Sequence, residues 1–139
     1  MIQDVAFLQT VRNRWAAIRG FQGRVNRGFA FSFSRGGFFS HEATQLVEAL
    51  LVVLAFGVLE EVLLQLRREG TFASKDRNLE ELIRASAPPA LPWQNRALVD
   101  GGREDRNDIA HRARLIATAR SRELIDAIEV ELRIWGIVV

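Results

Sequence analysis

The sequence predicts an all-α protein, a bundle of four to five helices. Apolar residues recur every three or four positions over about 4–19 and 121–135, which is the spacing of one face of an amphipathic helix. A longer apolar stretch fills 41–68, and clusters of glycine and proline separate the three segments. The chain has 139 residues and no long linker, so we expect a single domain over 1–139 with one core.

The composition excludes several classes of site. Because the chain has no cysteine, it can form neither disulfides, thiolate zinc sites nor cysteine nucleophiles. His41 and His111 are the only imidazoles, so we expect no metal site and no cofactor. The first residues lack the pattern of a secretory signal, and the apolar run over 49–59 is shorter than the ~20 residues that span a bilayer. We therefore expect a soluble, cytoplasmic protein that does not enter a membrane.

Charge is unevenly distributed along the chain. The net charge is only +2, yet 18 of the 19 basic residues are arginine. Residues 1–41 hold six Arg and one Asp, and residues 93–122 hold seven Arg and four acids, whereas the segments between and after them are acidic. This alternation indicates a basic surface patch that suits phosphates. Charges scattered over a solvated surface explain it equally well.

The N-terminal third contains a predicted helix followed by an unusual segment. We expect a helix over about 4–19 that ends at Gly20, with these residues facing inward: Val5, Leu8, Val11, Trp15 and Ile18. Residues 20–39 combine five Gly and six Phe with Arg24, Arg27 and Arg35. Phe29, Phe31 and Phe33 alternate with small residues, as in an extended segment. This insertion is either a nucleic-acid-binding arm or a segment packed on the helices or a partner, and we favour packing because exposed Phe promotes aggregation.

A long helix is predicted over about 41–68, with Ser40 as N-cap and Glu42 in its first turn. It would be about 42 Å long. Its middle is apolar almost all round, so it should be buried on more than one side. We therefore expect a second copy of the chain to cover part of it in a two-fold dimer.

The remaining helices are shorter. A helix is expected from Ser74 to about Ala85, and a further helical stretch over 93–99 that ends before Gly101-Gly102. Asp105 is the expected N-cap of a helix that continues to about Ala119. The last helix should open at Ser121 and bury one stripe of residues: Ile125, Ile128, Leu132 and Trp135.

The segment Arg106-Asn107-Asp108-Ile109-Ala110-His111 carries the chemistry. If Asp105 caps the helix, Arg106 and the free backbone N–H groups of the first turn converge on a place that suits a phosphate. Asn107 and His111 are four apart and share a face, whereas Arg106 and His111 are about 140° apart. The structural alternative is an ion-paired Arg106, a capping Asn107 and a His111 hydrogen-bonded in the core.

This segment resembles the Arg-x4-6-His signature of HEPN (higher eukaryotes and prokaryotes nucleotide-binding) domains. Arg106 matches the Arg, Asn107 the polar residue that follows it, and His111 the His. Arg112 stands where a Gly is frequent. The order of helices is also similar over about residues 40–139, while the Arg/Gly/Phe segment before them has no counterpart.

The resemblance implies a homodimer in which two motifs face each other and form one composite cleft. It also implies a metal-independent endoribonuclease of toxin–antitoxin or defence type, whose products end in a 2′,3′-cyclic phosphate and a 5′-OH. His111 would transfer a proton and Arg106 would neutralise charge on the phosphate, while Asn107 would orient the imidazole. Arg103 and Arg112 flank the motif and would bind neighbouring phosphates of the RNA.

One departure from the pattern bears on regulation. Some HEPN toxins carry a Tyr two residues after the His, to which a partner nucleotidyltransferase adds AMP. Ala113 occupies that position and the chain has no Tyr, so an antitoxin or nucleotidyltransferase-like partner would need another mechanism. Two other readings remain: a non-catalytic HEPN module for RNA binding or dimerisation, and a structural helical protein in which the motif is coincidence.

Overall fold

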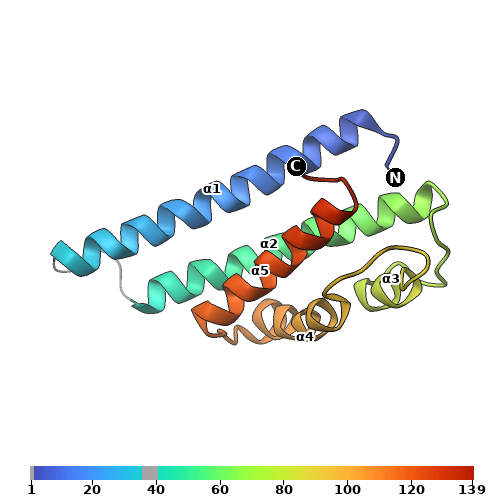
Figure 1. Ribbon diagram of the computed structural model, residues 1–139. Coiled ribbons are helices and arrows are strands. Elements are labelled where there is room, and N and C mark those ends of the chain that lie inside the picture. Colours follow the sequence, from blue (N-terminus) through green and yellow to red (C-terminus); the bar gives the residue numbers. More distant parts are fainter. Residues whose placement is uncertain (1, 36–40) are drawn as a thin grey trace.

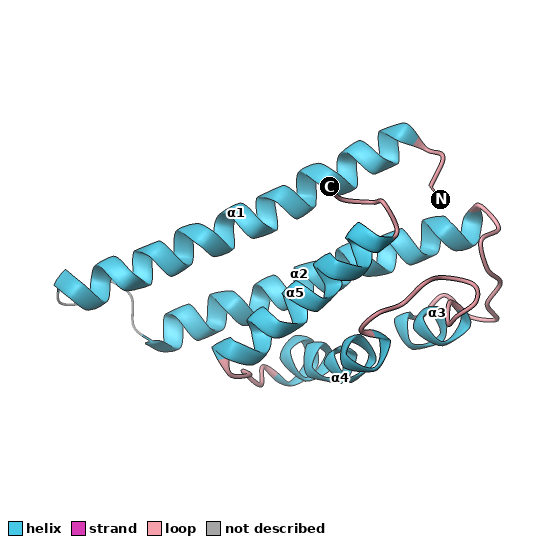
Figure 2. Cartoon of the chain, viewed as in Figure 1, coloured by secondary structure: helices cyan, strands magenta, loops and turns pink. Residues whose placement is uncertain are grey.

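The computed structural model describes residues 2–35 and 41–139, with side chains described for 2–27 and 41–139. Within these ranges the chain forms helices and no strands, which confirms the predicted all-α class (Figures 1 and 2). The helices are α1 (Val5–Arg35), α2 (His41–Arg68), α3 (Leu79–Ala85), α4 (Arg96–Arg112) and α5 (Thr118–Ile134). None of the described helices is both long enough and apolar enough to cross a membrane.

Helix α2 is the centre of the bundle, and its predicted bounds are confirmed. It contacts each of the other four helices, with α1 on one side and α3 and α4 on the other (Figure 1). Its apolar middle is buried on several sides, with no exposed surface at these residues: Ala49, Val52, Ala55, Phe56, Leu59, Val62, Leu63 and Leu66. Glu42 lies in the first turn as expected, whereas Ser40 lies outside the described residues.

Helix α1 does not end at Gly20, so that prediction is wrong, and so is the prediction of an extended segment after it. The helix continues to Arg35 because the buried positions also continue at helical spacing beyond Ile18, to Gln22 and Val25. Packing of this face on α2 offsets the ~1 kcal/mol that a glycine costs in a helix. Val5, expected to face inward, is 77% exposed. The side chains of 28–39, including the alternating Phe residues, lie outside the described set.

The contact between α1 and α5 is centred on Glu129. Its carboxylate accepts a hydrogen bond from Trp15 Nε1 at 2.8 Å and pairs with Arg19 Nε at 2.8 Å and Arg133 Nη2 at 2.8 Å. Burial raises the pKa of Glu129, but the hydrogen bonds from Trp15 and Arg133 and the charges of Arg19 and Arg133 outweigh it and hold the pKa below its usual value. The ionised carboxylate therefore stabilises this junction.

Helix α4 differs most from the prediction. It begins at Arg96 and runs through Gly101-Gly102 without a break, so Asp105 is not an N-cap. Gly102 is buried, and a Cβ built there would lie 2.3 Å from Leu124 Cδ2 and 3.0 Å from Phe56 Cζ. The glycine therefore allows α4 to pack closely against α2 and α5, and does not end a helix.

Helix α5 buries the residues predicted for it, but both α3 and α5 begin at other residues than predicted. Asn78, not Ser74, caps α3, and its Oδ1 accepts from the Glu81 backbone N–H at 2.9 Å. Helix α5 starts at Thr118, three residues before Ser121, because α4 ends at Arg112 and not near Ala119. The predicted buried stripe of α5 is confirmed, and its residues are fully enclosed: Ile125, Ile128, Leu132 and Trp135.

Candidate functional site

The motif lies in the last two turns of α4, so the prediction that it opens a helix is wrong. The difference changes the electrostatics of the site. The C-terminal end of a helix carries partial negative charge, which favours cationic side chains and disfavours anions. His111 and Arg112 lie in this last turn. Any phosphate bound here must therefore be held by side chains and not by free backbone N–H groups.

Arg106 is held between α4 and α2. Its Nη1 donates to Asn107 Oδ1 at 3.0 Å, and its Nη2 lies 3.3 Å from Glu60 Oε2 on α2. About a quarter of the side chain is exposed, but its Nε is buried and has no hydrogen-bond partner. Sequence reasoning missed Glu60, because the apolar helix around it says nothing about which neighbour this carboxylate meets.

His111 is exposed and makes no hydrogen bond to the described part of the chain, so it is not the core histidine of the structural alternative. It lies five positions after Arg106, which puts the two about 140° apart around the helix axis. Asn107 is one turn before His111 on nearly the same face, but its amide oxygen accepts from Arg106. The predicted orienting role of Asn107 is therefore not seen, and the imidazole remains open to a ligand.

The two flanking arginines differ in their surroundings. The Arg103 side chain is only 14% exposed, and it lies 3.2 Å from Asp100 and 3.8 Å from Glu80. Arg112 is 70% exposed and lies 3.7 Å from Asp108. The structure thus brings Arg103 together with Arg106 and Asn107 around one small cavity, while His111 and Arg112 lie outside it.

Helix α5 holds the site helix in place through Arg120. Its Nε lies 3.0 Å from Asp105 Oδ2 on α4, and its Nη1 lies 3.0 Å from Glu123. Burial lowers the pKa of Arg120, but the hydrogen bonds to Asp105 and Glu123 outweigh it and raise the pKa above its usual value. Asp105, expected to cap a helix, instead anchors the middle of α4 to α5.

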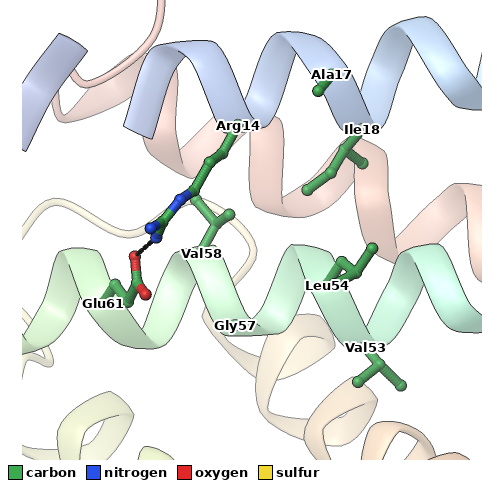
Figure 3. A pocket seen from close by; sticks show the side chains of 8 residues that line it. All are labelled: Arg14, Ala17, Ile18, Val53, Leu54, Gly57, Val58 and Glu61. Carbon is green, nitrogen blue, oxygen red and sulfur yellow. Dashed lines mark hydrogen bonds and ion pairs between the residues drawn. The ribbon is translucent and has the colours of Figure 1, made fainter. Parts of the chain in front are cut away.

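An uncovered apolar face of α2 lies next to the site. Leu46, Leu50 and Leu54 follow one another at intervals of four and are 47%, 50% and 57% exposed. Beside them a groove of about 460 Å³ runs between α1 and α2 (Figure 3). Its walls include Ala17, Ile18, Val53, Leu54 and Val58, and the Arg14–Glu61 ion pair closes one end. We refer to these three leucines and this groove as the α2 face.

The α2 face and Arg106 adjoin the same turn of α2. Glu60 pairs with Arg106 of α4, and the next residue, Glu61, pairs with Arg14 of α1. Successive helical residues point about 100° apart, so these two carboxylates reach the helices on either side of the face. A partner that covered the face would therefore also approach Arg106.

In the described ranges, no group of three or more His, Cys, Asp or Glu side chains is arranged to hold a metal ion. No protein-family model matches the chain, and neither curated proteins nor solved structures give a match.

Proposed function

We propose that this chain is a HEPN-type, metal-independent endoribonuclease that cleaves RNA by attack of the 2′-OH on the adjacent phosphate. The observation that carries the proposal is the contrast between two motif residues. Arg106 is fixed by Glu60 and Asn107, whereas His111 is exposed and unbonded one turn further along the same helix. The reaction requires a fixed cation and a free imidazole at the same phosphate, and in a dimer these two groups, about 140° apart on one helix, would be brought together from two copies.

Arg106 and His111 have different roles in this reaction. The 2′-oxygen loses its proton and forms a bond to phosphorus while the bond to the 5′-oxygen breaks, which leaves a 2′,3′-cyclic phosphate and a 5′-OH once the 5′-oxygen gains a proton. His111 transfers protons, because an imidazole can both accept and donate a proton. Arg106 stabilises the negative charge that grows on the phosphoryl oxygens.

We also propose that the active form is a two-fold dimer built on the α2 face. The exposed leucines lie on the face, and Gly57, which lines the groove, has open space where a Cβ would lie. The chain's own packing does not require this glycine, although it costs ~1 kcal/mol in a helix, so close approach of a partner helix explains it. The α2 face from Leu46 to Glu61, two helices wide, measures about 23 by 20 Å and would bury roughly 900 Å² in total, the size of a weak or transient interface.

The ion pair between Arg106 and Glu60 favours a second candidate function. At 3.3 Å the carboxylate partly neutralises the guanidinium that would have to meet the phosphate. A non-catalytic HEPN module for RNA binding or dimerisation would need no free Arg106.

In a toxin–antitoxin or defence setting, an antitoxin or nucleotidyltransferase-like partner would restrain either form. It would do so without AMP transfer to Tyr, because Ala113 stands at that position.

The test is cleavage of labelled single-stranded RNA in the presence of EDTA. We expect the wild-type protein to cleave, with a rate maximum near neutral pH, and Arg106→Ala and His111→Ala each to abolish cleavage while keeping the helical circular dichroism spectrum. His41→Ala removes the chain's other imidazole and should remain active. A metal-dependent reaction, or an active His111→Ala protein, would refute the mechanism. A wild-type protein that binds RNA without cleaving it would support the second candidate.

A further inference from the structure

A small cavity lies between the start of α3 and the middle of α4. Its volume is about 160 Å³, roughly five times what one water molecule takes up in the liquid. It is therefore large enough for a phosphate group. The residues that line it are Asn78, Leu79, Glu80, Arg103, Arg106 and Asn107.

The two amides that line the cavity have their N–H donors free for a ligand. Asn78 Oδ1 accepts from the Glu81 backbone N–H at 2.9 Å, and Asn107 Oδ1 accepts from Arg106 Nη1 at 3.0 Å. The NH2 group of each amide has no partner among the described residues. Since each oxygen already accepts one hydrogen bond and both N–H donors of each amide are unused, the amides offer a ligand mainly donors.

The two guanidinium groups add charge to these donors. Arg106 lines the cavity and adds positive charge there, although its Nε is buried out of reach of a ligand. Arg103 is largely buried; its Nε donates to Asp100, which is 49% exposed, at 3.2 Å, and its Nη2 lies 3.8 Å from Glu80, which is 71% exposed. Exposed carboxylates at these distances contribute little and can move aside.

We propose that this cavity binds one phosphate of an RNA backbone, next to the phosphate that is cleaved. This inference rests on the proposed function and adds Asn78 to the substrate-binding residues. Asn107 links the two places, because it lines the cavity and precedes His111 by one helical turn, ~6 Å along the axis. Arg103 and the NH2 groups of Asn78 and Asn107 hold the neighbouring phosphate, which positions the strand relative to the imidazole.

The variant Asn78→Asp tests the proposal with little risk to folding. Aspartate caps a helix as well as asparagine does, so α3 keeps its N-cap. The substitution replaces the donating NH2 with a negatively charged oxygen inside the cavity, which repels a phosphate. Asn13→Asp is the matched control: it makes the same charge change at an exposed position of α1, a helix that does not contact α3 or α4 in the described structure.

The first readout needs no catalysis. Inorganic phosphate is titrated into the full-length ¹⁵N-labelled protein, and the side-chain NH2 signals of Asn78 and Asn107 are followed by NMR. We expect saturable shifts of both signals in the wild type and in Asn13→Asp, and no saturable shift of the Asn107 signal in Asn78→Asp. The proposal is overturned if phosphate shifts neither of the two wild-type signals, or if it still shifts the Asn107 signal in Asn78→Asp.

The second readout uses RNA. Asn78→Asp should raise KM about tenfold with kcat within twofold, because the contact is made equally in the ground and transition states. The salt dependence of binding should lose about one unit of slope. An active Asn78→Asp enzyme with the KM of Asn13→Asp would refute the cavity and leave the ribonuclease standing. The expected phosphate titration with an inert wild-type protein would support the cavity and refute the ribonuclease.

Discussion

Replacing Gly102 by alanine tests the packing that places the site helix. An added Cβ would lie 2.3 Å from Leu124 Cδ2 and 3.0 Å from Phe56 Cζ, and both of those side chains are completely buried. Neither can swing into solvent, so α4 must move away from α2 and α5. The adjacent Gly101 provides a matched control, because a Cβ there would meet only Arg120 Nη2, at an ordinary 3.9 Å.

The magnitude follows from two opposing effects. Alanine is better than glycine inside a helix by ~1 kcal/mol, and Gly101→Ala should be stabilised by about that amount. Gly102→Ala gains the same term but also overpacks a filled core, which costs about 1–3 kcal/mol. The difference between the two variants removes the helix term, so Gly102→Ala should be less stable than Gly101→Ala by roughly 1–3 kcal/mol.

Urea unfolding followed by circular dichroism measures both variants. All proteins are compared at one concentration, since dimerisation would make stability depend on concentration. RNA cleavage by Gly102→Ala should also fall, because movement of α4 shifts Arg106 relative to Glu60. If Gly102→Ala is as stable as Gly101→Ala, the close approach of α4 to α2 and α5 is wrong, and with it the placement of the motif.

Three further predictions concern other parts of the molecule. Because the folded-state pKa of Glu129 lies below its usual 4.5, its stabilisation is complete above pH 4.5 and is lost as the pH falls through the folded-state pKa. Glu129→Gln should therefore cost about 1–2 kcal/mol at pH 7 by urea unfolding and progressively less as the pH is lowered below 4.5; a loss that does not change with pH contradicts this. Leu54→Glu should make the protein monomeric by light scattering at micromolar concentration, whereas the control Ile134→Glu, at an exposed apolar position on α5, should leave the dimer intact. A wild-type monomer would count against the α2 face as an interface. Replacing all three arginines of 20–35 together should weaken RNA binding and flatten its salt dependence if this part of α1 contacts RNA, and unchanged binding with lower stability would favour packing.

The local sequence pattern was sufficient to predict the helix at the centre of the bundle. The bounds of α2 follow from a largely apolar run of residues between Glu42 in the first turn and Arg67 and Arg68 in the last turn, with Gly70 following. The inward stripe of α5 follows from the 3.6-residue period, which is a property of the chain alone. The chemistry assigned to the motif stays a prediction, because it rests on the residue types Arg, Asn and His and not on packing.

The tertiary structure decided where helices start and end, and therefore what surrounds the motif. Gly20 and Gly101-Gly102 are local signals for helix ends, yet the helix continues through each of them because of contacts with distant residues. At Gly20, α2 packs along α1. At Gly102, Leu124 and Phe56 occupy the space that a side chain would need. Glu60 and Asn78 are likewise 46 and 28 positions from Arg106, and only the packing of α2 and α3 on α4 brings them to it. A glycine's local cost of about 1 kcal/mol is smaller than what burial of a helix face contributes, so the long-range contacts determine the outcome.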